Sequence, residues 1–73
     1  MVKLTLRVSR VEEDHFSGKT WGYHVYLELP LTKGVLQEGI DLATPIHLFC
    51  KTKAVADNFT LGSLVTLSIK TES

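Results

Sequence analysis

The side chains that could do metal or thiol chemistry are few: three histidines, His15, His24 and His47, and a single cysteine, Cys50. Imidazole and thiolate groups bind zinc in proteins, but a structural zinc site needs four ligands that converge. The alternation of the neighbouring residues points Cys50 inward and both His24 and His47 outward. We therefore expect Cys50 to be a small core residue, with no metal and no cofactor. The remaining alternative is a site shared by His24 and His47, which lacks a third and a fourth ligand.

Catalytic motifs are incomplete in this chain. Asp14 and His15 are adjacent, and adjacent residues rarely point at the same reacting atom. No serine lies in a motif that supplies a neighbouring base. Gly18-Lys19-Thr20 resembles the end of a phosphate-binding loop, but Glu13 stands where that motif requires an earlier glycine. We predict a protein that is not an enzyme and has no catalytic residues.

The element that organises the chain is predicted between Trp21 and Leu29. Apolar residues occupy every second position of this stretch, which is the period of a strand with one buried face. The stretch contains the only tryptophan and both tyrosines of the sequence. We predict a central strand with Trp21 among its inward residues, ended by Pro30, which has no N–H to give to a neighbouring strand.

A first strand is predicted before it, over residues 2–9, where apolar and polar residues alternate cleanly. Arg10 then takes a position where an apolar residue is due, which indicates a bulge or the end of the strand. We predict an acidic turn over residues 12–14. Residues 16–20 complete a loop that we expect to be too long for a two-residue hairpin.

The second half of the chain predicts two more strands and one helix. Residues 46–51 alternate again, and residues 64–70 form a last strand that buries Val65, Leu67 and Ile69. Residues 53–59 are the one plausible helix, capped by Thr52, with Val55 and Phe59 on one face. Residues 31–44 fit a short strand or a packed loop equally well.

These elements predict a single all-β domain over residues 1–73. The expected architecture is a small antiparallel barrel of four to five strands, with one short helical turn before the last strand. A helix in that position is typical of SH3-like barrels, whereas long first strands around a curved sheet are typical of OB-like barrels. Neither resemblance carries functional residues with it.

Charge and hydropathy limit the partners. Eight basic and eight acidic residues give a formal charge of zero, which removes the general argument for a nucleic-acid or membrane-surface partner. No apolar run approaches the length of a membrane span, and we expect no secretory signal because the chain does not open with basic residues followed by a long apolar run. We expect no membrane partner, and a cytoplasmic location.

The outward sheet face is the candidate binding surface, because basic and aromatic side chains alternate there while most acids are expected in turns. Its predicted partner-binding residues are Lys3, Arg7, His24, Tyr26, His47, Phe49 and Lys51. Exposed aromatic residues favour protein–protein contacts or homo-oligomeric assembly through this face. The alternative is single-stranded DNA or RNA, since rings stack on bases and cations neutralise phosphates. A third interpretation is that these residues have no binding role. The basic side chains would then belong to an ordinary solvated strand face, and Phe49 would pack under a loop.

Overall fold

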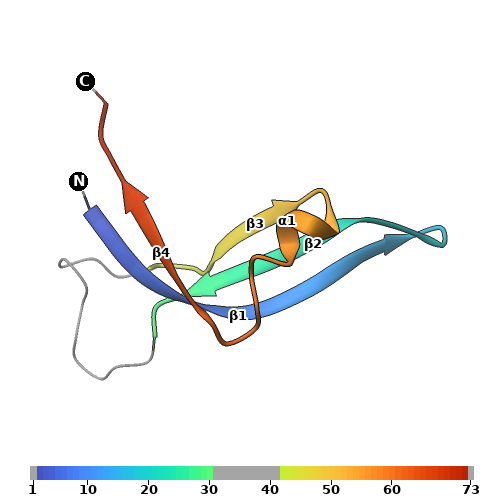
Figure 1. Ribbon diagram of the computed structural model, residues 1–73, viewed down its shortest axis with the longest axis horizontal. Helices are drawn as coiled ribbons and strands as arrows, with labels where there is room; N and C mark the ends of the chain where they lie inside the picture. Colours follow the sequence, from blue (N-terminus) through green and yellow to red (C-terminus); the bar gives the residue numbers. More distant parts are fainter. Residues whose placement is uncertain (1, 31–41, 73) are drawn as a thin grey trace.

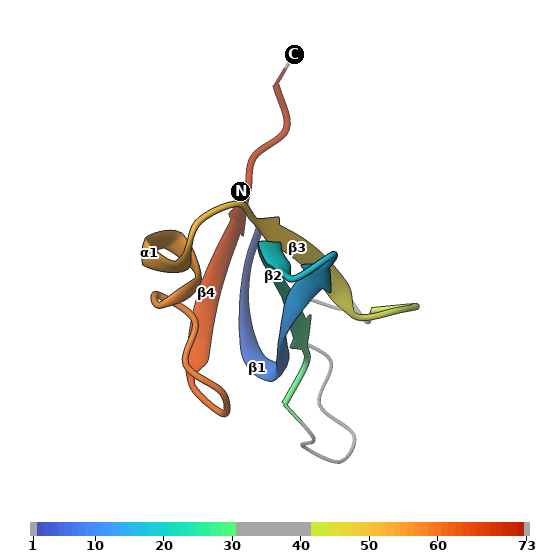
Figure 2. The ribbon, with the colours of Figure 1, turned by 90° about the vertical axis from the view of Figure 1, so that its right-hand side faces the viewer.

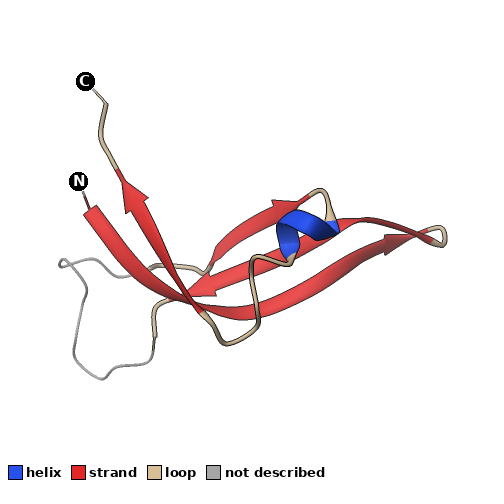
Figure 3. Cartoon of the chain, viewed as in Figure 1, coloured by secondary structure: helices blue, strands red, loops and turns tan. Residues whose placement is uncertain are grey.

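The computed structural model describes residues 2–30 and 42–72 of the chain, as four strands and one short helix (Figure 1). The strands are β1 (Val2–Phe16), β2 (Lys19–Glu28), β3 (Ile46–Cys50) and β4 (Leu64–Ile69), and the helix α1 (Lys53–Ala56) lies between β3 and β4. The predicted all-β class and the helical turn before the last strand are confirmed (Figure 3). Residues 31–41, where the strand or loop was left open, lie outside the described residues.

The four strands form one antiparallel sheet in the order β3-β2-β1-β4. The sheet twists strongly, with β4 at one edge and β3 at the other (Figure 2). The described strands make a curled half-barrel, in which β2 is an interior strand as predicted.

The first strand is nearly twice as long as predicted. Residues 12–14, expected as an acidic turn, continue β1 and pair with residues 22–24 of β2. The break in phase that Arg10 produces is a bulge, because the register shifts between Val8 and Arg10. Ser9 lies at this shift, and its Oγ donates a hydrogen bond to the Tyr26 carbonyl oxygen at 3.2 Å. The bulge moves every later residue of β1 to the opposite face.

The connection from β1 to β2 is a two-residue hairpin, so the prediction of a longer loop was wrong. Phe16 pairs with Lys19, and the two residues between them, Ser17 and Gly18, have φ angles of 53° and 76°. Two successive positive φ angles are the geometry of a type I′ turn, whose twist matches that of the flanking strands. A serine in the first position gave no clear signal of it.

The inward side chain of Trp21 was also predicted wrongly, because this residue is 57% exposed. The pairing skips Trp21 between its neighbours Thr20 and Gly22. Its indole Nε1 donates to the Phe16 carbonyl oxygen at 3.1 Å, across the end of the hairpin. Figure 1 shows this end projecting past the rest of the sheet, where none of the described helices and strands covers it.

The core lies on the inward face and follows the predicted alternation. Leu4, Leu6 and Val8 of β1 pack against Val25 and Leu27 of β2, and all are buried. Cys50 and Ala56 complete this cluster, so the core role predicted for Cys50 is confirmed. The fold thus uses its most regular alternation, in β1 and β2, to build its centre.

The later elements follow the predictions with small corrections. Thr52 caps α1, with its Oγ1 accepting from the Val55 N–H at 3.3 Å. The helix buries Ala56, whereas Val55 is exposed. Because α1 ends at Ala56, Phe59 lies outside it and does not share a helix face with Val55 as predicted, although Phe59 packs against the core. Ile69 of β4 was predicted to be buried, but it is 46% exposed.

Candidate outward-face site

The outward face of the sheet holds the residues that the sequence singled out, and the bulge adds three more. Arg10 of β1 lies opposite Tyr26 of β2, and Glu12 lies opposite His24. On the other side of β2, Tyr26 lies opposite His47 and His24 opposite Phe49. Directly opposed side chains on one face of a sheet lie close enough to interact. Three strands therefore contribute to one continuous surface.

Four rings on this surface form a continuous series, which we call the aromatic row: Phe49, His24, His47 and Tyr26. The ring of Tyr26 stacks on that of His47, with centroids 4.5 Å apart and an angle of 10° between planes. His47 and His24 are tilted, with centroids 4.8 Å apart, and the His24 ring is 5.1 Å from that of Phe49. The row runs obliquely across β2 and β3.

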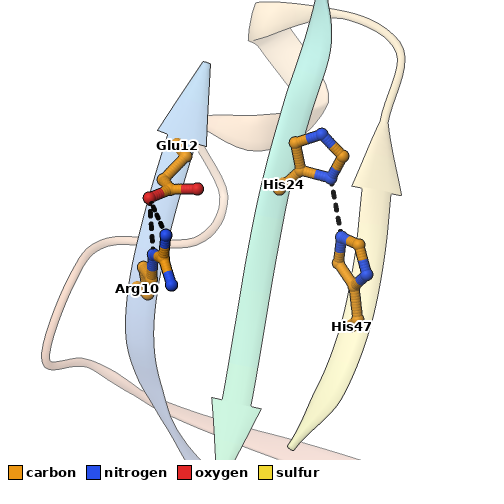
Figure 4. A network of polar contacts seen from close by, with 4 residues as sticks. All are labelled: Arg10, Glu12, His24 and His47. Atoms are coloured by element: carbon orange, nitrogen blue, oxygen red, sulfur yellow. Dashed lines mark hydrogen bonds and ion pairs between the residues drawn. The ribbon is translucent and has the colours of Figure 1, made fainter. Parts of the chain in front are cut away.

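The two histidines are also joined by a hydrogen bond, drawn in Figure 4. His24 Nδ1 lies 2.6 Å from His47 Nε2. Such a bond needs one ring to donate an N–H and the other to accept with a bare nitrogen. At least one of the two rings is therefore neutral when the bond is formed, and each fixes the orientation of the other.

Charged residues of β1 border the row on its Tyr26 and His24 side. The guanidinium carbon of Arg10 lies 5.2 Å from the centroid of the Tyr26 ring, within the range of a cation–π contact. Arg10 is also paired with Glu12, whose Oε1 accepts from Nε at 2.6 Å (Figure 4). Asp14 Oδ2 lies 3.5 Å from His24 Nε2. The surface around the row is thus mixed in charge.

Phe49 ends the row at a glycine. A Cβ atom on Gly22 would lie 2.3 Å from Phe49 Cζ and 2.9 Å from the Cys50 carbonyl oxygen. The ring occupies the space that a side chain at position 22 would take. This contact holds Phe49 against β2 but leaves 47% of the residue exposed.

The predicted partner-binding residues divide into two groups. The first comprises His24, Tyr26, His47 and Phe49, which the structure brings together in the aromatic row. Lys3 and Arg7 are exposed on the half of β1 that pairs with β4, and Arg7 lies opposite Glu28. Lys51 is exposed just after the end of β3. The cation that contacts the row is Arg10, which the prediction left out.

Arg10, Glu12 and Asp14 are the surface residues that the sequence reasoning missed. A signal for them existed, because the three residues alternate with Val11 and Glu13 once a bulge is placed at Ser9. The prediction that acids avoid the strands was wrong for this reason: Glu12, Glu13 and Asp14 are all within β1. The outward face carries acids beside its bases.

Metal binding and membrane insertion gain no support from the described residues. Among residues 2–30 and 42–72, no group of three or more His, Cys, Asp or Glu side chains is arranged to hold a metal ion. The same residues include no helix of the length and hydropathy needed to cross a bilayer. Comparison of the chain with models of protein families, with curated proteins and with solved structures found no match to any of them.

Proposed function

We propose that the protein is a non-enzymatic binding module that uses the aromatic row and its charged border to contact a protein partner or a second copy of itself. The observation that carries the proposal is the half-exposed ring of Phe49 at the end of an ordered series of rings. Aromatic rings that are already fixed lose little conformational freedom on binding, so they suit the centre of an interface.

The charge of the border favours a protein over a polyanion. Arg10 is neutralised by Glu12, Asp14 stands beside His24, and Arg7 lies opposite Glu28. Carboxylates repel phosphate groups, whereas alternating charges can pair with the mixed surface of a protein. The Tyr26 ring is in contact with His47 of β3 and with Arg10 of β1, on its two neighbouring strands. A base would have to displace one of them in order to stack there.

The experiment is cross-linking of the purified protein, alone and in extract from its native cells, followed by mass determination of the products. Phe49→Ser should abolish the specific product, because it removes the exposed apolar ring at the end of the row. Val55→Ser is the matched control, since Val55 is a similarly exposed apolar residue that lies on α1. Products that survive both substitutions would refute a role for the aromatic row, provided that circular dichroism shows both variants folded.

A single-stranded nucleic acid is the second candidate, and one observation favours it: Lys3 and Arg7 are exposed on the same face as the row. Fluorescence anisotropy with a labelled single-stranded oligonucleotide at low salt tests it. Binding that weakens steeply with salt and falls in the Lys3→Glu, Arg7→Glu double variant would select this candidate. An unchanged anisotropy at all protein concentrations would eliminate it.

We further propose that the half-barrel is of the SH3-like or OB-like kind. The support comes from β1, whose first half pairs with β4 and whose second half pairs with β2. A long strand that bends at a bulge and serves two strands is one way to curl a sheet toward closure. An experimental structure of the whole chain would test whether the barrel closes.

A further inference from the structure

The edge strand β4 is paired on one side only within the described residues. Its register with β1 is regular over its whole length, from Val2 opposite Ile69 to Arg7 opposite Leu64. Among the described helices and strands, β4 contacts β1 and no other. An edge strand presents a row of backbone donors and acceptors that can pair with another strand.

This edge lacks the features that usually prevent such pairing. Residues 64–69 read Leu-Val-Thr-Leu-Ser-Ile, without a charge, a proline or a glycine. Charges, prolines and bulges are the common means of blocking an edge strand. Leu64 is 62% exposed and Ile69 is 46% exposed, while Val65 and Leu67 are half-buried. The strand therefore also leaves apolar area for a partner to cover.

The hydrogen bonds at the start of β4 show which backbone groups face outward. The Val8 N–H donates to the Ser63 carbonyl oxygen at 2.9 Å, and the Val8 carbonyl oxygen accepts from the Gly62 N–H at 2.8 Å, so both backbone groups of Val8 point toward the β4 side of β1. Along β1 the same orientation recurs at every second residue, so Leu6, Leu4 and Val2 form the hydrogen-bonded pairs with Val65, Leu67 and Ile69. Hydrogen-bonded and non-hydrogen-bonded pairs alternate along an antiparallel ladder. The N–H and C=O groups of Leu64, Thr66 and Ser68 consequently point away from β1, toward the open edge.

We propose that β4 pairs antiparallel with β4 of a second copy of this chain. The argument for a second copy is that the strand is complementary to itself. With Leu67 on the two-fold axis, Val65 faces Ile69 of the other copy on the inward side, and Thr66 faces Ser68 on the outward side. Each of the inward residues Val65, Leu67 and Ile69 then meets an apolar residue, while Leu64 lies opposite Lys70 just past the end of the other strand, and no two charges are opposed. The two inward faces become continuous, and the exposed part of Ile69 is covered.

This contact uses an edge and not the outward face, so it stands independently of the function proposed above. Sedimentation equilibrium should give a mass of twice the 8.1 kDa of one chain at high protein concentration. Amide hydrogen exchange provides a second measurement on the unaltered protein. The amides of Thr66 and Ser68 should be protected at high concentration and should exchange quickly on dilution, while the Leu67 amide changes little.

Thr66→Pro is the decisive variant, because it removes an N–H that the monomer does not use and the dimer needs. We expect it to weaken dimerisation by about tenfold or more, since two strand hydrogen bonds are lost across the two-fold axis. Thr66→Val keeps the N–H and the β-branched shape, and should dimerise like the unaltered protein. If Thr66→Pro proves unfolded, amide exchange in the unaltered protein provides the test. Protection of the Thr66 and Ser68 amides that increases with protein concentration would support pairing through β4.

Phe49→Ser separates this inference from a dimer through the aromatic row. Dimerisation that is lost in Thr66→Pro and kept in Phe49→Ser supports pairing through β4. Dimerisation that is lost only in Phe49→Ser overturns it and supports self-association through the outward face. A strict monomer at all concentrations, with rapid exchange at Thr66 and Ser68, also overturns it and excludes self-association through either surface.

Discussion

His24 Nδ1 and His47 Nε2 lie 2.6 Å apart across the neighbouring strands β2 and β3, in a hydrogen bond between two imidazole rings. The bond fixes the orientation of each imidazole ring relative to the other. Ring contacts then extend the series from His24 to Phe49 and from His47 to Tyr26. The sequence suggests His24 and His47 as a possible metal-binding pair. In the structure the two rings form the middle of the aromatic row.

Replacing His47 with alanine should lower the free energy of unfolding by about 1 kcal/mol, because one hydrogen bond and one stacked ring are lost. Urea denaturation followed by circular dichroism measures it. His15→Ala is the control, since His15 is an exposed histidine whose carboxylate partner is Glu13, at 2.5 Å. We expect that change to be within about 0.5 kcal/mol, as for other exposed ion pairs. Equal effects of the two substitutions would contradict the importance of the row.

Gly22→Ala should destabilise the protein by about 1–3 kcal/mol, because the new methyl group meets both the Phe49 ring and the Cys50 carbonyl oxygen. The ring can move, but the carbonyl oxygen is held by the sheet. Combining Gly22→Ala with Phe49→Ala should therefore cost less than the sum of the two single changes. Strict additivity in the double-mutant cycle would show that the ring does not occupy the space beside position 22.

Leu6→Ala should destabilise by about 2–5 kcal/mol, since Leu6 is fully buried at the centre of the core and leaves a cavity. A domain of this size has little stability in reserve, so we expect the variant to be largely unfolded at room temperature. Val11→Ala is the comparison, because Val11 is partly exposed on the same strand. A thermal melt of the Leu6 variant that matches that of the Val11 variant would refute this placement of the core.

Ser17→Asn should raise the free energy of unfolding by about 0.5 kcal/mol, because asparagine tolerates a positive φ better than serine in a type I′ turn. The φ angle of 53° at this residue is the basis of the prediction. Ser17→Val should have the opposite effect, since a β-branched side chain is disfavoured at positive φ. Thermal melts of both variants provide the test, and a stabilised valine variant would be incompatible with the turn.

The parts of the fold that the sequence predicted well are those in which one physical rule acts alone. The alternation of Leu4, Leu6 and Val8 predicted a buried face, and these residues are buried. Thr52 predicted a helix start, and its side chain caps α1. In each case the side-chain type and the local backbone lead to the same structure.

The predictions failed where two rules compete. A run of three acids suggested a turn, but the pairing of β1 with β2 continues through them because the Ser17-Gly18 turn closes the hairpin tightly. Trp21 fits the alternation of β2, yet the pairing skips it and its neighbours are hairpin residues beyond the core. A single sequence gives the period of a strand but not the position of each irregularity within it.

The outward-face residues were predicted in part for the same reason. The outward placement of four residues depends only on the alternation within β2 and β3, and the structure places these residues side by side: His24, Tyr26, His47 and Phe49. Arg10 depends on the bulge at Ser9, which decides the face of every residue after it. An error of one residue in the predicted alternation assigns Arg10 to the wrong face of the sheet. The sequence reasoning therefore left this cation out of the outward surface.

The division of β1 between two partner strands also sets an order of assembly. Its second half meets β2 across a turn of two residues, so this hairpin closes at a small entropic cost. Its first half must wait for β4, which is separated from it by most of the chain. Contacts between distant segments form late because the intervening loop has to be closed first. We therefore expect β4 to dock last, and half of β1 to remain an unpaired strand for most of the folding reaction.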